Sequence, residues 1–228
     1  ITGTMGEMHG KKIVKITEMA GQWGMPIVGF HESAGARLQE FLAVSREYGN
    51  LFYLNSIYSG VVPQISALLG VVAGGQTYSP GLTDFIFMTQ DGAAFIAGPP
   101  LVESVIGEKI SVEDLGGARM HASVSGVCHV VAKDDRQAID QIKELLSYLP
   151  QTCRDKDKLP RVASNDSPQR TSEKLLEIVG GGPRLPYDMH QIIKEIVDNG
   201  RFFEIHKDFA KSMIVGFARL DGSSVGVI

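Results

Sequence analysis

Short apolar runs that alternate with helical segments are the feature that most constrains how this chain can fold. The runs have the length and composition of buried strands, and they occupy residues 26–30, 64–72, 84–88, 93–97 and 127–132. Helical signals mark residues 6–23, 41–57 and 134–148, and Asp134 is placed to cap the last of these helices. This alternation of strand and helix predicts an α/β fold with parallel strands.

The composition is that of a globular protein and argues against several kinds of partner. The chain has 228 residues, of which 43% are hydrophobic, and a formal charge of −4 with both signs interspersed. No basic block exists to neutralise phosphates, so we do not expect nucleic acid as a partner. No apolar run reaches the roughly 18 residues of a membrane-spanning helix, and we expect no membrane contact. Cys128 and Cys153 have neither a CxxC nor a metal-ligand spacing, which favours a reducing compartment and no metal site.

The composition changes after Pro150. Residues 151–171 are polar and charged and contain two prolines, which is typical of a linker. Helical signals follow at residues 172–179 and 188–199, and Asp221-Gly222 predicts the turn of a β-hairpin. We therefore expect a first unit at 1–150, a linker at 151–171 and a second unit at 172–228. Because the chain starts at Ile1 and stops within an apolar strand, we expect a fragment whose second unit is truncated.

The stretch His31-Glu32-Ser33-Ala34-Gly35 raises the question of a serine nucleophile. The nucleophile elbow of α/β-hydrolases is G-x-S-x-G, and His31 stands where the first glycine belongs. A turn or capping role is favoured for Ser33. The zinc signature H-E-x-x-H also fails here, because Gly35 replaces its second histidine.

Nucleotide-binding loops fit no better. The stretch from Gly6 to Lys12 is one residue too short for G-x-x-x-x-G-K-[ST], and Lys12 is not a hydroxyl residue. A weaker phosphate contact at the helix start near Gly6 stays open. Cys128 and His129 are adjacent on a predicted strand, so they point to opposite faces and are expected to pack in the core. The remaining histidines with no usable spacing are His9, His121, His190 and His206.

Two turns of small residues remain as candidates for function. Ala34-Gly35-Ala36 follows one strand and Ala73-Gly74-Gly75 follows the next. Small residues let a ligand carbonyl approach backbone N–H groups closely, and two such groups form an oxyanion hole. The alternative is that the turns only pack tightly against helices. The residues by themselves leave both interpretations open.

Several segments resemble one known family. They are TGTMGEMHGKKIVKITEMA, ESAGARLQE, VPQISALLGVVAGGQTYSPGLTDF, FIAGPPLVESVIGE, EDLGGARMHASVSGVCHVVAKDD and LPYDMHQIIKEIVDNGRFFEIHKDFAKSMIVGFARLDG. In this order they resemble the carboxyltransferase β subunit of biotin-dependent acyl-CoA carboxylases, the propionyl-CoA carboxylase type above all. The resemblance implies a crotonase-like spiral fold with two homologous halves, of which this chain holds most of the first and the start of the second.

The resemblance also implies which residues act. It gives backbone oxyanion roles to Gly35, Ala36, Gly74 and Gly75, and substrate contacts to Ser33, Ala34, Gly98 and Pro99. The family usually has Asp-Ser-Gly-Gly where this chain has Glu32-Ser33-Ala34-Gly35, which puts the loop geometry in question. Arg37 and Gln39 are expected to brace this loop.

By the same resemblance, the protein moves a carboxyl group from carboxybiotin to the α-carbon of a short acyl-CoA such as propionyl-CoA, through an enolate. The first half binds acyl-CoA and the second binds biotin, which is carried on a partner subunit or domain together with a biotin carboxylase. A homo-hexamer in the cytoplasm or the mitochondrial matrix is implied for the full-length protein, and residues 1–228 by themselves are not expected to transfer carboxyl groups. A decarboxylase or transcarboxylase subunit of the same family, or a non-catalytic scaffolding homologue, remains an alternative.

Overall fold

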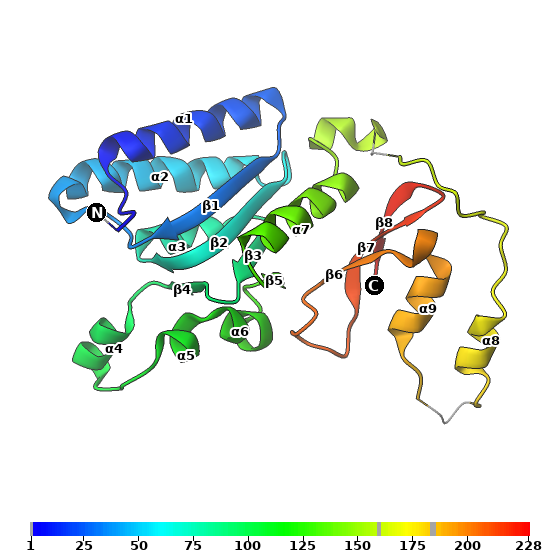
Figure 1. The fold of residues 1–228 in the computed structure, drawn as a ribbon. Helices are drawn as coiled ribbons and strands as arrows, with labels where there is room; N and C mark the ends of the chain where they lie inside the picture. The colour runs from blue at the N-terminus through cyan, green and yellow to red at the C-terminus, as the bar shows by residue number, and fades with distance from the viewer. Residues whose placement is uncertain (1, 159–160, 183–185) are drawn as a thin grey trace.

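A twisted parallel sheet lies at the centre of the first half of the chain (Figure 1). The computed structural model describes residues 2–158, 161–182 and 186–228. The sheet strands are β1 (Ile27–Ser33), β2 (Gln64–Ala73), β3 (Phe85–Thr89), β4 (Ala93–Phe95) and β5 (Val130–Ala132). Their order is β1-β2-β3-β5, β4 pairs with β2, and every pairing is parallel. The predicted parallel α/β fold is confirmed.

Strand β2 changes partner along its length. Its first part pairs with β3, and its last three residues pair with β4. The register against β1 also shifts, from His31 opposite Leu68 to Ser33 opposite Val72. Gly70 lies at this shift, where a Cβ would come 2.9 Å from the Glu32 carboxylate carbon. After this shift, the last residue of β1, Ser33, lies opposite Val72, one residue before the end of β2. The turns that follow the two strands are therefore neighbours.

Helices cover the sheet as the apolar pattern predicts. Figure 1 shows α1 (Glu7–Trp23) and α2 (Phe41–Tyr58) side by side over the sheet. Helix α7 (Asp135–Tyr148) lies against β2, β3 and β5. Helix α1 ends at Gly24 with a φ of 71°. The Asp134 side chain accepts a hydrogen bond from the Gln137 amide, so the predicted cap of α7 is confirmed. Helix α7 packs through Ile142 and Leu145 in one core cluster with residues of β2 and β3.

Short helices fill the chain between β2 and β5. They are α3 (Gly75–Gly81), α4 (Pro99–Ile106), α5 (Val112–Gly116) and α6 (Ala118–Met120), and a π-helical turn follows at His121–Ser125. The strand predicted from Val127 begins only at Val130, so Cys128 and His129 precede it and their placement on alternate strand faces was wrong. Cys128 is nevertheless buried as expected, and its thiol donates to the Val130 carbonyl.

The last part of the chain contains a small antiparallel sheet. After the 3-10 turn at Cys153–Lys158 come α8 (Lys174–Val179), α9 (Met189–Ile196), the turn Asp198–Gly200, β6 (Phe202–Ile205), β7 (Val215–Leu220) and β8 (Ser223–Val227). Strands β7 and β8 form the predicted hairpin through Asp221 and Gly222, both with positive φ. Strand β6 was not predicted; it pairs with β7.

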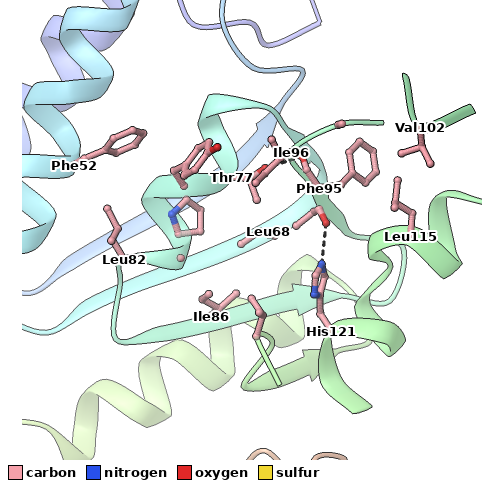
Figure 2. Close-up of a pocket in the computed structure, with 16 residues that line it drawn as sticks. Phe52, Leu68, Thr77, Leu82, Ile86, Phe95, Ile96, Val102, Leu115 and His121 are labelled. Atoms are coloured by element: carbon pink, nitrogen blue, oxygen red, sulfur yellow. Dashed lines mark hydrogen bonds between the residues drawn. The ribbon is translucent and has the colours of Figure 1, made fainter. Parts of the chain in front are cut away.

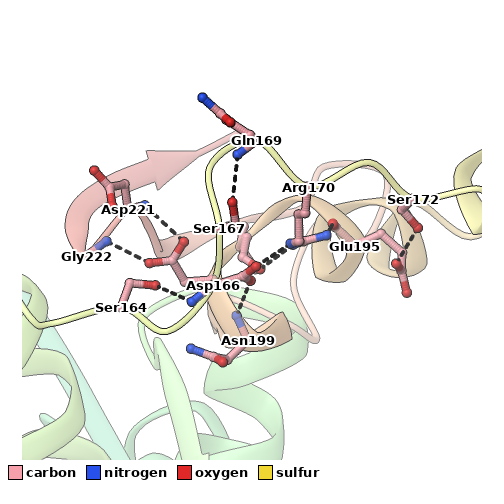
Figure 3. Close-up of polar contacts among 12 residues, drawn as sticks. Ser164, Asp166, Ser167, Gln169, Arg170, Ser172, Glu195, Asn199, Asp221 and Gly222 are labelled. Carbon is pink, nitrogen blue, oxygen red and sulfur yellow. Dashed lines mark hydrogen bonds and ion pairs between the residues drawn. The ribbon is translucent and has the colours of Figure 1, made fainter.

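The expected linker lies against this second sheet (Figure 3). The Asn199 amide donates to Asp166 over 2.9 Å, and Arg170 donates to the Glu195 carbonyl over 2.6 Å. The Val162 amide donates to the carbonyl of Gly222 in the hairpin turn. Residues 161–170 are thus held by the second part of the chain rather than extending freely from it.

The two parts of the chain also share apolar packing. Phe203 and Ile205 of β6 belong to the same buried cluster as Tyr148 of α7. The Arg219 guanidinium lies 4.2 Å from the centre of the Tyr148 ring and donates to the Ser147 carbonyl. The proposed division at 150 and 171 therefore separates segments that pack against each other.

Candidate active site

The two small-residue turns lie in direct contact. Gly35 has a φ of +96°, and a Cβ placed there would come 2.9 Å from the Ala73 carbonyl oxygen and 3.6 Å from the Gly74 Cα. Gly74 has a φ of +62°. Glycine adopts such conformations without the strain that other residues would incur, and at Gly35 the contact with Ala73 also leaves no room for a side chain. The structure thus brings together the four residues predicted to supply backbone amides.

Two of these four amides donate hydrogen bonds within the described part of the chain, and two do not. The Gly35 amide donates to Ser33 Oγ over 3.1 Å, and the Gly74 amide donates to the Phe95 carbonyl over 3.1 Å. Within the described residues, the amides of Ala36 and Gly75 donate to no acceptor. Both residues are half-buried. Gly35 and Gly74 therefore shape the turns, while each turn keeps one free donor.

Ser33 is a structural residue in this geometry. It is 5% exposed, and its hydroxyl donates to the Gly3 carbonyl over 2.8 Å while accepting from the Gly35 amide. Both hydrogen-bonding functions of the hydroxyl are used within the chain, as expected for a turn residue. Ala34, the next predicted substrate contact, is exposed, and its amide donates to the Thr2 carbonyl.

Arg37 braces the loop that follows β1. Its guanidinium donates to Glu40 over 2.8 Å and to the Thr4 carbonyl over 3.4 Å. The other Glu40 oxygen accepts from the Glu7 amide, which lowers the pKa of Glu40, and the hydrogen bond from Arg37 lowers it further. Gln39 is exposed. These contacts support the bracing role expected of Arg37.

Gly98 and Pro99 begin α4 and connect to the second turn through β4. Gly98 is the N-cap of α4, and Pro99 occupies its first position. A Cβ at Gly98 would lie 3.3 Å from the ring of Phe95, whose carbonyl accepts from the Gly74 amide. Gly98 is therefore linked to the second turn through Phe95, and Pro99 follows it directly in the chain.

An apolar cavity of about 660 Å³ opens beside α3 (Figure 2). Its lining includes Phe52, Tyr78, Leu82, Phe95, Ile96 and Val102. His121 also faces the cavity, and its Nε2 is hydrogen-bonded to the Ala94 carbonyl over 2.8 Å. Sequence reasoning missed this cavity because its walls come from segments far apart in the chain. No residue of the two turns lines it, although α3 begins at Gly75.

A buried polar chain lies directly behind Gly75. Gln76 is 7% exposed, and its side-chain oxygen accepts from the Tyr48 hydroxyl over 3.3 Å. Its side-chain nitrogen lies 3.3 Å from Nδ1 of His31. Burial lowers the pKa of His31 to about 4 and raises that of Tyr48 to about 12, so both are neutral near pH 7. Sequence reasoning considered His31 only for a nucleophile elbow and a zinc signature, and it did not find these hydrogen bonds.

The part of the chain that the structure describes contains neither a candidate metal site nor a membrane-spanning helix. No group of three or more His, Cys, Asp or Glu side chains is placed to hold a metal ion. Across the same residues, no helix has both the length and the apolar character needed to cross a bilayer.

The chain belongs to the Carboxyl transferase domain family, whose model matches residues 1–228. It is 46% identical over 227 residues to the propionyl-CoA carboxylase carboxyltransferase subunit of Haloferax mediterranei. It is equally similar, at 46%, to the methylmalonyl-CoA decarboxylase subunit alpha of Propionigenium modestum. Each match covers 99% of this chain and 44% of the relative, so the chain spans less than half the length of these proteins.

A solved structure shows the same fold. The crystal structure of transcarboxylase 12S, a hexamer with methylmalonyl-CoA and methylmalonic acid bound, superposes with a TM-score of 0.93 at 40% identity. The match covers 98% of this chain and 43% of that one. The expected crotonase-like fold and the resemblance to carboxyltransferase subunits are both confirmed.

Proposed function

We propose that the protein containing this chain is the carboxyltransferase component of a biotin-dependent acyl-CoA carboxylase. It moves a carboxyl group from carboxybiotin to the α-carbon of a short acyl-CoA such as propionyl-CoA. The observation that carries this proposal is the pair of free amides, Ala36 N–H and Gly75 N–H, on two turns in direct contact. The propionyl-CoA carboxylase subunits among the relatives support the acyl-CoA class.

The chemistry follows from the arrangement of the amides. The thioester oxygen gains negative charge when the α-carbon loses its proton, and two fixed N–H donors stabilise that charge without reorganising. Removing one such donor typically costs about 2.7–4 kcal/mol of transition-state stabilisation. Ser33 and Arg37 act through the loop by fixing the Ala36 amide, and neither reacts with the substrate. The exposed Ala34, with Gly98 and Pro99 at the start of α4, is proposed to contact the acyl-CoA.

Biotin supplies the carboxyl group when it is presented by a partner subunit or domain. We assign the two free amides to the thioester oxygen, and we assign no residue of this chain to the biotin ring. We also propose that the full-length protein is a homo-hexamer that works with a biotin carboxylase and a biotin carrier, in the cytoplasm or the mitochondrial matrix. The hexameric transcarboxylase relative supports this assembly. So do the exposed apolar side chains of α4, among them Leu101, Val105 and Ile106.

The second candidate is a decarboxylase of the same family. It is favoured by the equal identity to the methylmalonyl-CoA decarboxylase subunits of Propionigenium modestum and Veillonella parvula, at 46% and 45%. Both candidates use the same enolate, because carboxylation and decarboxylation are the two directions of one transfer. A non-catalytic scaffolding homologue would not require free backbone donors on these two turns.

Carboxyl transfer to free biotin tests the proposal. The full-length protein is incubated with methylmalonyl-CoA labelled with ¹⁴C in its free carboxyl group, with and without biotin. We expect label to move to biotin and propionyl-CoA to form only when biotin is present. A protein that folds and binds propionyl-CoA but transfers no label would contradict the proposal. Co-purification with a biotin carboxylase would favour the carboxylase over the decarboxylase.

A further inference from the structure

We infer that Gln76 is a positioning residue, held by Tyr48 and His31, that keeps the Gly75 amide in place against α2 and β1. This inference rests on the proposed function of that amide. Gly74 and Gly75 have no side chains with which to fix their own rotation, so neighbouring residues must hold the turn. Gln76 is the next residue along the chain and begins the buried part of α3.

The Gly74 side of the turn is held by Thr77. The Thr77 amide donates to the Gly74 carbonyl over 3.1 Å. Its hydroxyl lies 3.1 Å from the carbonyls of both Val72 and Phe95, at the ends of β2 and β4. These contacts fix the start of α3 relative to the sheet. Because the Gly74 carbonyl and the Gly75 N–H belong to one planar peptide group, the Thr77 bond also restrains the plane of that group. The position of the group against α2 and β1 depends on other residues.

The side of Gly75 that faces α2 is held by Tyr48. A Cβ placed at Gly75 would come 3.0 Å from the Tyr48 ring, so the ring lies directly against the Gly75 backbone. The hydroxyl of the same ring donates to Gln76, over 3.3 Å. Tyr48 is 6% exposed and comes from α2, so it connects the turn to the longest helix of the fold.

His31 completes the chain from β1. Because the Gln76 side-chain oxygen accepts from Tyr48, its nitrogen faces His31 and donates to Nδ1. The imidazole must therefore carry its proton on Nε2. It has room to lie there because residue 29 is glycine: a Cβ at Gly29 would come 2.5 Å from His31 Nε2. Three elements, α2, α3 and β1, thus meet at one side chain beside Gly75.

Infrared difference spectroscopy provides the test, with propionyl-CoA labelled with ¹³C at its thioester carbonyl and bound to the full-length protein. The variants are Gln76→Met, which removes both hydrogen bonds, and Tyr48→Phe, which keeps the ring against Gly75 and removes one. The matched control is Ser79→Ala. Ser79 lies one turn further along α3 and donates to Asn55 of α2 over 2.9 Å, so this variant also removes a buried bond between α2 and α3.

In the unaltered protein we expect the carbonyl band to lie at lower frequency than in free propionyl-CoA, as a hydrogen-bonded thioester oxygen should. In Gln76→Met the band should move back toward the free position, and kcat should fall about 10- to 100-fold, the scale of a misplaced catalytic group. The KM for propionyl-CoA should change less than about threefold. Tyr48→Phe should show the same changes to a smaller extent, and Ser79→Ala should change neither the band nor kcat.

The outcomes separate this inference from the proposed function. If the unaltered protein shows no shifted band, the oxyanion role of Gly75 fails and the inference fails with it. If the band is shifted but stays in place in Gln76→Met, only the inference is overturned. An equal loss of kcat in Ser79→Ala would also overturn it, because a general loosening of α3 would then explain the data. Should Gln76→Met not fold, Tyr48→Phe decides by the same criteria.

Discussion

At the residue scale, the Ser33 hydroxyl connects the N-terminal segment to the loop after β1 through the Gly3 carbonyl and the Gly35 amide. Ser33→Ala should lower the free energy of unfolding by about 1–3 kcal/mol, because it leaves buried polar groups unpaired. Carboxyl transfer by the full-length variant should fall less than about tenfold. Chemical denaturation and the ¹⁴C transfer assay measure the two effects. A loss near 10⁴-fold in a folded variant, the scale of a removed nucleophile, would show that Ser33 reacts with substrate.

His129 gives the fold a pH dependence. Its Nδ1 accepts from the Ile86 amide over 3.1 Å, and its ring lies 4.4 Å from that of His206. Burial, together with the nearby His206, lowers the pKa of His129 to about 4. An unfolded histidine has a pKa near 6.5, so between these values the unfolded chain binds a proton that the folded chain does not. The free energy of unfolding therefore falls as the pH drops from about 6.5 toward 4.

His129→Asn tests this effect, since asparagine keeps an oxygen that can accept from the Ile86 amide. For one such group, the loss between pH 7.5 and pH 5 is on the order of 1–2 kcal/mol. The variant should therefore lose less stability than the unaltered protein over this range. Thermal unfolding at several pH values measures the difference. Equal slopes in the two proteins would show that His129 already titrates normally when folded.

At the scale of elements, the Arg37–Glu40 pair joins the loop after β1 to the segment before α1. Arg37→Met should loosen this loop and raise deuterium exchange at residues 33–36, while the exchange of β2 stays unchanged. Arg46→Met is the control. Arg46 pairs with Glu7 and Glu47, its side chain is 59% exposed, and within the described residues it donates no hydrogen bond to residues 33–36. Equal exchange in the two variants at residues 33–36 would contradict a bracing role for Arg37.

The elements that sequence predicted well are those whose burial gives a strong local pattern. The runs at 64–72 and 84–88 correspond to β2 and β3, which are largely buried, and Gly24 and Asp134 mark real helix ends. Strand β6 has only four residues, and α5 and α6 are each too short to show a helical period. The strand at 127–132 was placed too early because Val127 and Cys128 are apolar in a loop. Val127 is exposed, and the burial of Cys128 comes from tertiary packing, which local pattern does not report.

The candidate site was predictable to the same limited degree. The two turns could be found because glycine and alanine at the ends of strands are visible in the sequence. Which amides stay free could not, since that depends on Ser33 and Phe95 accepting the other two. The link from Tyr48 to Gln76 and His31 spans 28 and 45 residues, and it forms only when α2, α3 and β1 pack together.

At the scale of the whole molecule, this chain holds the side of the site that we assign to acyl-CoA. It spans 44% of its propionyl-CoA carboxylase relative, and its second sheet packs on α7 through Phe203 and Ile205. We propose that biotin binds to a part of the protein that this chain does not include. We therefore expect carboxyl transfer to take place between this chain and another part of the full-length protein. This chain contributes the two free amides.

The rate of carboxyl transfer in Gly75→Val tests the central claim most directly. Valine at this position would press on the buried Tyr48 ring and displace the turn that carries the Gly75 amide. Gly49→Val is the matched control, because a Cβ at the exposed Gly49 of α2 meets nothing within 4 Å. With both variants folded, the account predicts a loss of about 10²–10³-fold in biotin-dependent ¹⁴C transfer for Gly75→Val and no loss for Gly49→Val. An unchanged rate in Gly75→Val would contradict the assignment of this amide to the oxyanion hole.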